Sequence, residues 1–158
     1  MHDILESPSG RLRALGLVLP PPPPAVGTYV NAVRTGPLVF LSGHVPFRVD
    51  GSVVMGKLGR DLDAAAGYEA ARLAGLGALA TRAHELGSLD RVRRLVRVLG
   101  VVNATAEFGE HTSVVNGASD LFVEVFGDAG RHARLAVGVA SLPFDIALEI
   151  EVIAEVEG

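Results

Sequence analysis

One arginine has surroundings that favour the chemistry of a small-molecule site. Arg134 lies in the apolar segment 132–142, and if this segment is a strand its alternate residues face opposite sides. The positions that share a side with Arg134 are all small: Ala136, Gly138 and Ala140. An arginine can bind a carboxylate through two parallel hydrogen bonds, and small neighbours leave room for the ligand. The pattern fits a carboxylate site, and it also fits an arginine that pairs with Glu149 or another carboxylate to hold the sheet.

A second polar group ends another predicted strand. Ser42 could donate its hydroxyl, Gly43 could expose a backbone amide, and His44 could carry a proton near neutral pH. An ordinary strand end with a surface histidine would explain the same residues. The sequence therefore offers two groups of polar residues, one near each end of the chain.

Several other chemistries are not expected. The chain has no cysteine, which excludes thiol nucleophiles, disulfides and thiolate metal sites. Its five histidines lack metal-ligand spacing, and no acidic cluster completes a metal site. The sequence also lacks a Gly-x-Ser-x-Gly motif, a phosphate-binding loop and a dinucleotide fingerprint. We therefore expect no metal and no cofactor.

Composition narrows the class of protein further. The 158 residues suit one domain, and 49% are hydrophobic, which is enough for a core. The formal net charge of −4 and the 5% aromatic content argue against a nucleic-acid partner. No apolar run is long enough to span a membrane, and the N-terminus lacks the basic start and apolar run of a signal peptide. We expect a cytoplasmic protein without a membrane partner.

The first part of the chain predicts an extension followed by strands. Residues 1–24 form this extension, with a short helix over 9–15 that ends at Gly16 and a run of prolines over 20–24. The prolines predict a stiff spacer, or alternatively a docking site for a proline-binding partner. Period-two alternation over 29–46, with a turn at 35–37, predicts a β-hairpin, and Asp50-Gly51 marks a further turn.

The rest of the chain alternates helices and strands. A long helix is predicted from Asp61 or Asp63 to Leu86, a strand over 91–105, and a second helix over 112–126. Three glycines in the first helix, Gly67, Gly75 and Gly77, are expected to mark close packing on a sheet. Strands over 132–142 and 146–156 are expected to pair as a hairpin. The order predicts an α+β fold with a mostly antiparallel sheet and two main helices on one face, leaving the other face for subunit association.

Four short stretches resemble a known family. The sequence reads GTYV at 27–30, LSGHVP at 41–46, HARLAVGVASLP at 132–143 and LEIEVIA at 148–154. In this order and spacing they resemble the signatures of the RidA/YjgF family: Gly-Pro-Tyr, Ser-Gly-Gln-apolar-Pro, Pro-Ala-Arg-Ser running into Leu-Pro, and a Val/Ile-Glu-Ile-Glu strand. Asn116 matches the family's asparagine at the second helix. The resemblance covers about residues 25–156, so we expect a RidA/YjgF-like domain over 25–158.

The resemblance implies a fold, an assembly and an activity. The fold is chorismate-mutase-like, and the assembly is a homotrimer with clefts between subunits. The activity is hydrolysis of small enamine and imine intermediates, such as 2-aminoacrylate, to 2-keto acids and ammonia without a cofactor. Arg134 would hold the substrate carboxylate, and Glu149, with the backbone carbonyl near Ala136, would place and polarise the attacking water. The cleft would be lined by Tyr29, Ser42, Gly43 and Asn116.

The sequence also departs from the family at positions that bear on function. The family's proline two residues before the arginine is His132, and its Ser-Gly-Gln is Ser-Gly-His, so His44 could add a titratable group to the cleft. Two further functions therefore stay open. One is a non-catalytic trimer that binds small carboxylate metabolites or guards client proteins. The other is an endoribonuclease, which the acidic charge and the few aromatic residues disfavour.

Overall fold

Five strands form one sheet whose spatial order differs from the chain order. In the computed structural model, which describes residues 6–158, the strands lie in the order β1 (Ala32–Thr35), β2 (Leu38–Leu41), β5 (Leu148–Val156), β3 (Val92–Asn103) and β4 (Ala133–Val139). The pairs β1–β2, β2–β5 and β3–β5 are antiparallel, and β3–β4 is parallel. The prediction of an α+β fold with a mostly antiparallel sheet is confirmed.

The predicted C-terminal hairpin is wrong. β4 and β5 follow each other in sequence, but β5 lies between β2 and β3, and β4 pairs with the far edge of β3. β5 buries every second residue along its whole length, from Leu148 to Val156, as a central strand does. The connection from β3 to β4 contains a helix, which permits parallel pairing of these two strands. β4 is therefore an edge strand, and the residues near Arg134 lie at the rim of the molecule.

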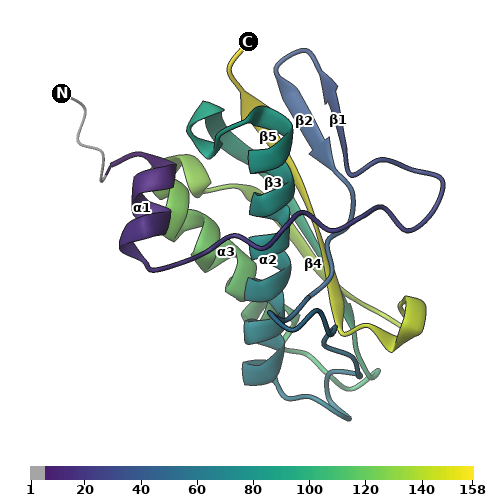
Figure 1. The fold of residues 1–158 in the computed structure, drawn as a ribbon. Helices are drawn as coiled ribbons and strands as arrows, with labels where there is room; N and C mark the ends of the chain where they lie inside the picture. The colour runs from purple at the N-terminus through teal and green to yellow at the C-terminus, as the bar shows by residue number, and fades with distance from the viewer. Residues whose placement is uncertain (1–5) are drawn as a thin grey trace.

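Two long helices cover one face of the sheet (Figure 1). α2 (Ala64–Leu86) begins at Asp63, whose side chain accepts a hydrogen bond from the amide of Ala66 at 2.8 Å, and ends at Gly87 with φ +78°. α3 (His111–Phe126) ends at Gly127. These limits agree with the prediction. The core lies between the helices and the sheet and includes Leu79, Val98, Leu121, Phe122 and Ile150, all at most 1% exposed.

The glycines of α2 meet two kinds of neighbour. Gly77 faces His44, which bridges to Ile150 of β5, so packing on the sheet is confirmed there. Gly75, in contrast, faces Ala118 and Leu121 of α3 rather than the sheet. From the other side, Gly117 of α3 lies so close to the backbone carbonyl of Tyr68 that a Cβ atom would overlap it. The helices therefore approach each other closely where both carry small residues. This contact fixes α3 against α2 and so positions the face that α3 turns toward β4.

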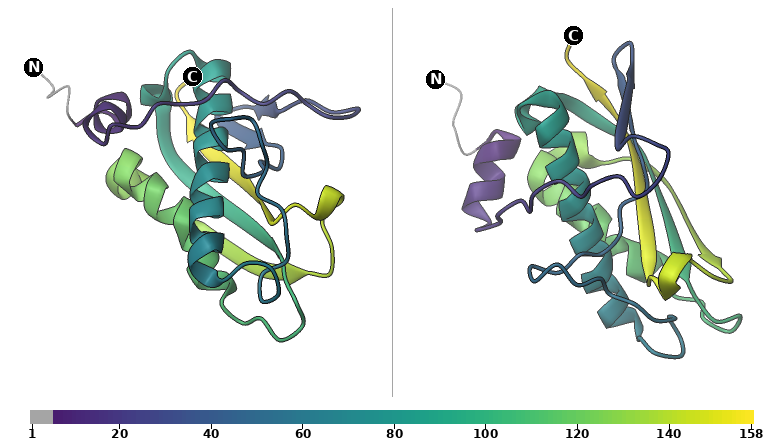
Figure 2. Two further views of the ribbon diagram at one scale, coloured as in Figure 1. Left: turned by 60° about the horizontal axis from the view of Figure 1, so that its bottom comes forward. Right: turned by 45° about the vertical axis from the view of Figure 1, so that its right-hand side comes forward.

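The N-terminal part wraps around the helices. α1 (Pro8–Ala14) begins at Ser7, whose hydroxyl accepts from the amide of Gly10 at 3.0 Å, and packs beside α3. The extended segment that follows crosses the outer side of α2 before it reaches β1 (Figures 1 and 2). Within residues 6–158, no helix combines the length and the apolar character needed to cross a bilayer.

The face of the sheet opposite the helices is uncovered in the single chain (Figure 2, right). It carries apolar side chains that remain partly or largely exposed, among them Phe40 at 39% and Leu135 at 47%. Glu149 and Glu151 of β5 lie on the same face, because their neighbours Leu148, Ile150 and Val152 point into the core. We refer to this surface as the open face.

Candidate functional site

Arg134 is held against α3 by neutral hydrogen-bond acceptors. Its pairing with the buried Val98 places its side chain on the helix side of β4. There Nη1 donates to Oδ1 of Asn116 at 2.7 Å and to Oγ of Ser119 at 3.1 Å, and Nη2 donates to the carbonyl of Thr112 at 3.4 Å. None of the described residues forms an ion pair with Arg134. The alternative in which Arg134 pairs with Glu149 or another carboxylate is therefore wrong.

Ser119 and His132 extend this group of residues. Oγ of Ser119 lies 2.9 Å from Nε2 of His132, and Nδ1 of His132 lies 2.6 Å from the carbonyl oxygen of Gly130. Burial lowers the pKa of the His132 imidazole, and the charge of Arg134 lowers it further, while the hydrogen bond to Gly130 acts in the opposite direction. Sequence reasoning noted His132 only as a departure from a family motif and did not single out Ser119.

A cavity of about 280 Å³ opens beside these side chains. Its walls are formed by Ser119, Asp120, Val123, Arg131, His132 and Arg134. Two of the six are arginines and one is an aspartate. Arg131 forms an ion pair with Asp128 at 3.5 Å, so Arg134 is the lining cation that suits a small anion. We call this cavity, together with Asn116, the Arg134 pocket.

Glu149 belongs to a second group, on the open face. Its Oε2 lies directly over Gly43, where a Cβ atom would overlap it. Burial raises the pKa of the Glu149 carboxyl. In the described part of the chain this carboxylate has no ion-pair partner. A carboxyl group in this environment can exchange a proton closer to neutral pH than an ordinary glutamate does.

Ser42 precedes Gly43 in the chain, and Tyr29 precedes the residues that Ser42 binds. The Ser42 hydroxyl donates to the carbonyl of Val30 at 2.6 Å, and the Ser42 amide donates to the carbonyl of Asn31 at 2.9 Å. The hydroxyl of Tyr29, which is 49% exposed, accepts from the amide of Val26 at 3.0 Å. These bonds tie the segment before β1 to the end of β2. We call Tyr29, Ser42, Gly43 and Glu149 the Glu149 group.

Within one chain the Arg134 pocket and the Glu149 group are separate. Arg134 pairs with Val98 and Glu149 with Val101, two strands apart in the sheet. The two positions are three residues apart along the strand direction and two strands apart across the sheet, which puts their Cα atoms roughly 14 Å apart. Their side chains also point to opposite faces of the sheet. Arg134 and Asn116 therefore form one half-site and Tyr29, Ser42, Gly43 and Glu149 the other, and one chain does not bring the two half-sites together.

His44 occupies neither half-site. It is 2% exposed, and its Nε2 lies 2.7 Å from the hydroxyl of Thr81 on α2, while Nδ1 lies 2.8 Å from the carbonyl of Ser42. Burial lowers the pKa of this imidazole, with a smaller contribution from the charge of Arg82. The structure thus corrects the expectation that His44 lines the cleft: the side chain fills the space between sheet and helix. Ala136 also faces the helices and is partly buried against the core.

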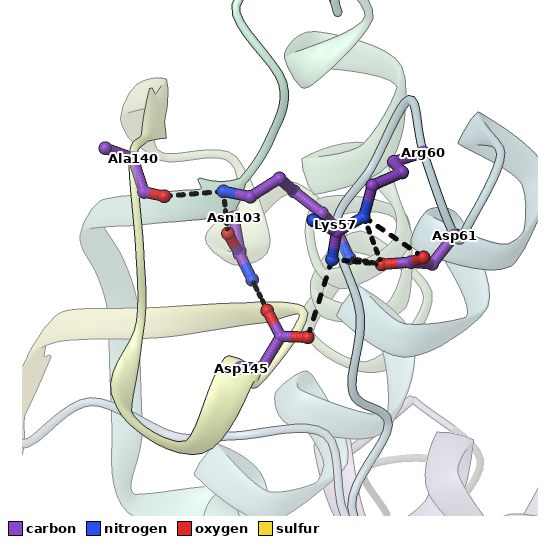
Figure 3. A network of polar contacts seen from close by, with 6 residues as sticks. All are labelled: Lys57, Arg60, Asp61, Asn103, Ala140 and Asp145. Carbon is purple, nitrogen blue, oxygen red and sulfur yellow. Dashed lines mark hydrogen bonds and ion pairs between the residues drawn. The ribbon is translucent and has the colours of Figure 1, made fainter.

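A larger cavity of about 540 Å³ lies at the other end of β4. Lys57 lines it and donates to Oδ1 of the buried Asn103 at 2.7 Å and to the carbonyl of Ala140 (Figure 3). Nδ2 of Asn103 donates in turn to Oδ1 of Asp145 at 2.9 Å, and Arg60 lies 3.8 Å from the other Asp145 oxygen. Asp145 and Phe144 both have positive φ values, +57° and +56°. The network therefore holds a turn that non-glycine residues rarely adopt.

The comparison with known proteins decides the family. A family model described as "YjgF/chorismate_mutase-like, putative endoribonuclease" matches residues 9–156. The chain belongs to the RidA/YjgF family. It is 40% identical over 148 residues to Protein TCP17 of Trypanosoma cruzi, covering 93% of this chain and 92% of that protein. The chorismate-mutase-like fold predicted from the sequence is confirmed.

Solved structures of RidA/YjgF proteins agree with this assignment. A "putative endoribonuclease" from Shewanella oneidensis superposes with a TM-score of 0.91 at 36% identity, covering 95% of this chain and 99% of that one. TdcF of Escherichia coli, solved with bound serine, is more distant, with a TM-score of 0.60 at 26% identity over 86% of this chain and 94% of that one. Among residues 6–158 no group of three or more His, Asp or Glu side chains is placed to hold a metal ion.

Proposed function

We propose that this RidA/YjgF protein hydrolyses small 2-imino carboxylates of the 2-aminoacrylate type to 2-keto acids and ammonia. The observation that carries the proposal is the set of contacts that Arg134 makes. Its guanidinium lines a cavity and contacts only neutral acceptors among the described residues. Its Nε atom takes part in none of the hydrogen bonds found there. A planar cation with donors to spare beside a small cavity is suited to a carboxylate.

The related TdcF supports the choice of ligand class. That protein was solved with serine bound, and serine has a carboxylate attached to a carbon that bears nitrogen. A 2-imino carboxylate shares this arrangement. The Arg134 pocket, about 280 Å³, has room for a small molecule of this kind.

Glu149 is the proposed residue for water. The carboxylate accepts a hydrogen bond from the attacking water and polarises it, and the raised pKa makes it a better proton acceptor than an ordinary glutamate. Because Arg134 and Glu149 of one chain lie on opposite faces, they can serve one substrate only if two subunits meet. We propose a homotrimer in which the β4 edge of one subunit lies against the Glu149 group of the next. The exposed apolar side chains of the open face support such an association.

Holding the substrate accounts for much of the expected catalysis. An imine next to a carboxylate is already electrophilic, so fixing it beside an ordered water removes the entropy cost of bringing the two together. The backbone of β4 at Ala136, at the free edge of the sheet, can supply a carbonyl acceptor for the same water.

A coupled assay tests the proposal. A pyridoxal-phosphate dehydratase generates 2-aminoacrylate or 2-aminocrotonate, and imine decay is followed with wild type, Arg134→Ala and Arg134→Lys. We expect faster decay with wild type, loss of the effect in Arg134→Ala, and a partial effect in Arg134→Lys, which keeps the charge but loses the planar fork. Arg13→Ala, at an exposed position on α1, is the matched control and should behave as wild type.

The same site supports a second function that the assay separates. If the wild type does not accelerate imine decay but binds pyruvate or 2-oxobutanoate, and Arg134→Ala abolishes the binding, the protein is a carboxylate-binding trimer without catalysis. If neither turnover nor binding depends on Arg134, both functions are excluded for this pocket.

A further inference from the structure

The hydrogen bonds around His132 fix the direction in which a proton can move. The carbonyl oxygen of Gly130 can only accept, so Nδ1 of His132 must carry a hydrogen. A neutral imidazole then has its lone pair on Nε2, which accepts from the Ser119 hydroxyl. Arg134 donates its Nη1 hydrogen to the same Ser119 oxygen. The Ser119 hydroxyl is therefore polarised from both sides: the cation stabilises negative charge on its oxygen, and the imidazole receives its proton.

The charge of Arg134 favours the neutral form of His132. Arg131 and Asp120 line the same cavity, and Arg131 forms an ion pair with Asp128, with Nε 3.5 Å from Oδ1. Asp120 accepts a hydrogen bond from the hydroxyl of Tyr68 at 2.7 Å. The ring of Phe122 lies against the imidazole, with centroids 6.1 Å apart. Burial is the largest influence on the His132 pKa and, together with Arg134, lowers it, so the imidazole is a proton acceptor near neutral pH.

A ligand on Arg134 would bring its reacting carbon to this pair. Oγ of Ser119 lies 3.1 Å from Nη1 of Arg134. One small molecule can therefore contact both groups through polar atoms on neighbouring carbons. When a carboxylate occupies the guanidinium, the carbon next to it and the nitrogen on that carbon lie near the Ser119 hydroxyl. Ser119 and His132 come from the same chain as Arg134, so this part of the site is complete without a second subunit.

We propose that Ser119, backed by His132, is the proton-transfer pair of the Arg134 pocket and serves substrates with a nitrogen on the carbon next to the carboxylate. The inference rests on the proposed function and deepens it. Ser119 is the group that touches the substrate or the water, and His132 acts through Ser119. Glu149 of the neighbouring subunit holds the water by one hydrogen, and the pair takes the other.

The reaction balances with these groups alone. The oxygen of water bonds to C2 of the 2-iminium carboxylate, and the electron pair of the C2–N double bond moves onto nitrogen. One water proton passes to Ser119 as the Ser119 proton passes to Nε2 of His132. The proton then returns by the same path to the amine, and the C2–N bond breaks with its electron pair on nitrogen. The C2 hydroxyl gives up its proton to the departing ammonia as C2=O forms, so the products are a 2-keto carboxylate and ammonium.

The pH profile of imine hydrolysis tests the pair. In wild type, kcat/KM should fall on the acid side as His132 becomes protonated, at a pH below the ordinary pKa of histidine. Glu149 must also be ionised to hold the water, so the wild-type acid limb should steepen to a slope of two on a logarithmic plot. Ser119→Ala and His132→Gln should each lower kcat by on the order of 10²-fold and reduce that slope to one, with KM changed by less than about threefold because Arg134 remains. Ser113→Ala and His84→Gln, at exposed positions on α3 and α2, are matched controls that should keep the wild-type profile.

Other results would contradict the proton-transfer role of Ser119 and His132. An acid limb whose slope stays at two in His132→Gln, or a change in KM alone, would overturn the proton-transfer role. A wild type without turnover would refute the proposed function, and the pair would then be judged by binding. In that case the imidazole resonances of His132 are followed by NMR while pyruvate is added. A shift that Arg134→Ala and Ser119→Ala both abolish supports the pair, and pyruvate binding at Arg134 without any response of His132 refutes it.

Discussion

Two inactive variants should restore each other's activity if the site is shared between subunits. Arg134→Ala removes the carboxylate anchor and leaves the Glu149 group intact, while Glu149→Ala does the reverse. Since Arg134 and Glu149 lie on opposite faces and roughly 14 Å apart, neither chain can assemble a complete site from its own residues. A mixed oligomer can do so wherever an Arg134-containing subunit lies next to a Glu149-containing one.

The size of the effect follows from the geometry. In a closed ring each site takes its arginine from one subunit and its glutamate from the next, so random mixing of equal amounts makes about one quarter of the sites complete. The fraction does not depend on the number of subunits. The matched control is an equal mixture of wild type and the Arg134→Ala/Glu149→Ala double variant. A shared site predicts about one quarter of the wild-type rate per chain in this mixture, and a site within one chain predicts about one half.

The assay is imine decay after subunit exchange, with the exchange verified by native mass spectrometry. We expect each parent variant to have at most about 1% of wild-type activity, and the exchanged mixture to approach one quarter. A fully exchanged mixture that stays at the level of its parents, together with one half in the control, would refute the shared site. A protein that is a monomer by light scattering would refute both the trimer and the shared site.

Three further predictions concern single positions. Gly43→Ala should lower kcat with little loss of stability, because the new Cβ atom displaces the Glu149 carboxylate from its place over residue 43. An unchanged kcat in the steady-state assay would show that the position of this carboxylate does not affect catalysis. Glu149→Gln should raise the melting temperature at pH 7 to 8. Burial raises the pKa of this carboxyl in the folded state, so the folded protein loses stability as pH rises through the interval between the unfolded and folded pKa values. Glutamine does not ionise, so its advantage in melting temperature should disappear below that interval. An advantage that persists at low pH would contradict the assignment. Arg82→Met should stabilise the protein by about 1–4 kcal/mol in chemical unfolding, since Arg82 is 1% exposed, its Nε and Nη2 atoms have no hydrogen-bond partner within residues 6–158, and burial lowers its pKa to about 10. A destabilised variant would indicate that the cation has an unrecognised partner.

Much of the fold could be predicted from local signals. Asp63 and Gly87 mark the ends of α2 because an N-terminal cap and a left-handed glycine are local requirements of a helix. The alternation of apolar residues and glutamates from Leu148 onward identifies β5 and shows that Glu149 lies away from the core. The pairing of the last two strands could not be predicted in this way, because it depends on which partner β3 and β5 each select across the whole sheet.

The candidate site was predicted in its residue types but not in its arrangement. Alternation correctly placed Arg134 and Ala136 on one side of β4, but β4 carries apolar residues on its other side as well, so the pattern does not reveal which side meets the helices. Arg134 is held by residues of α3, and His44 is held by a residue of α2. Ser119 lies 15 residues from Arg134 in the sequence and Thr81 lies 37 residues from His44, and no local spacing signals either contact.

A crystal structure with pyruvate bound would test the central claim most directly, because pyruvate is the keto acid product of 2-aminoacrylate. We predict that its carboxylate contacts the guanidinium of Arg134, that its 2-oxo oxygen lies near the Ser119 hydroxyl, and that Glu149 of a neighbouring subunit faces the same carbon. Pyruvate bound instead in the larger cavity beside Lys57, with the Arg134 pocket empty, would contradict the account.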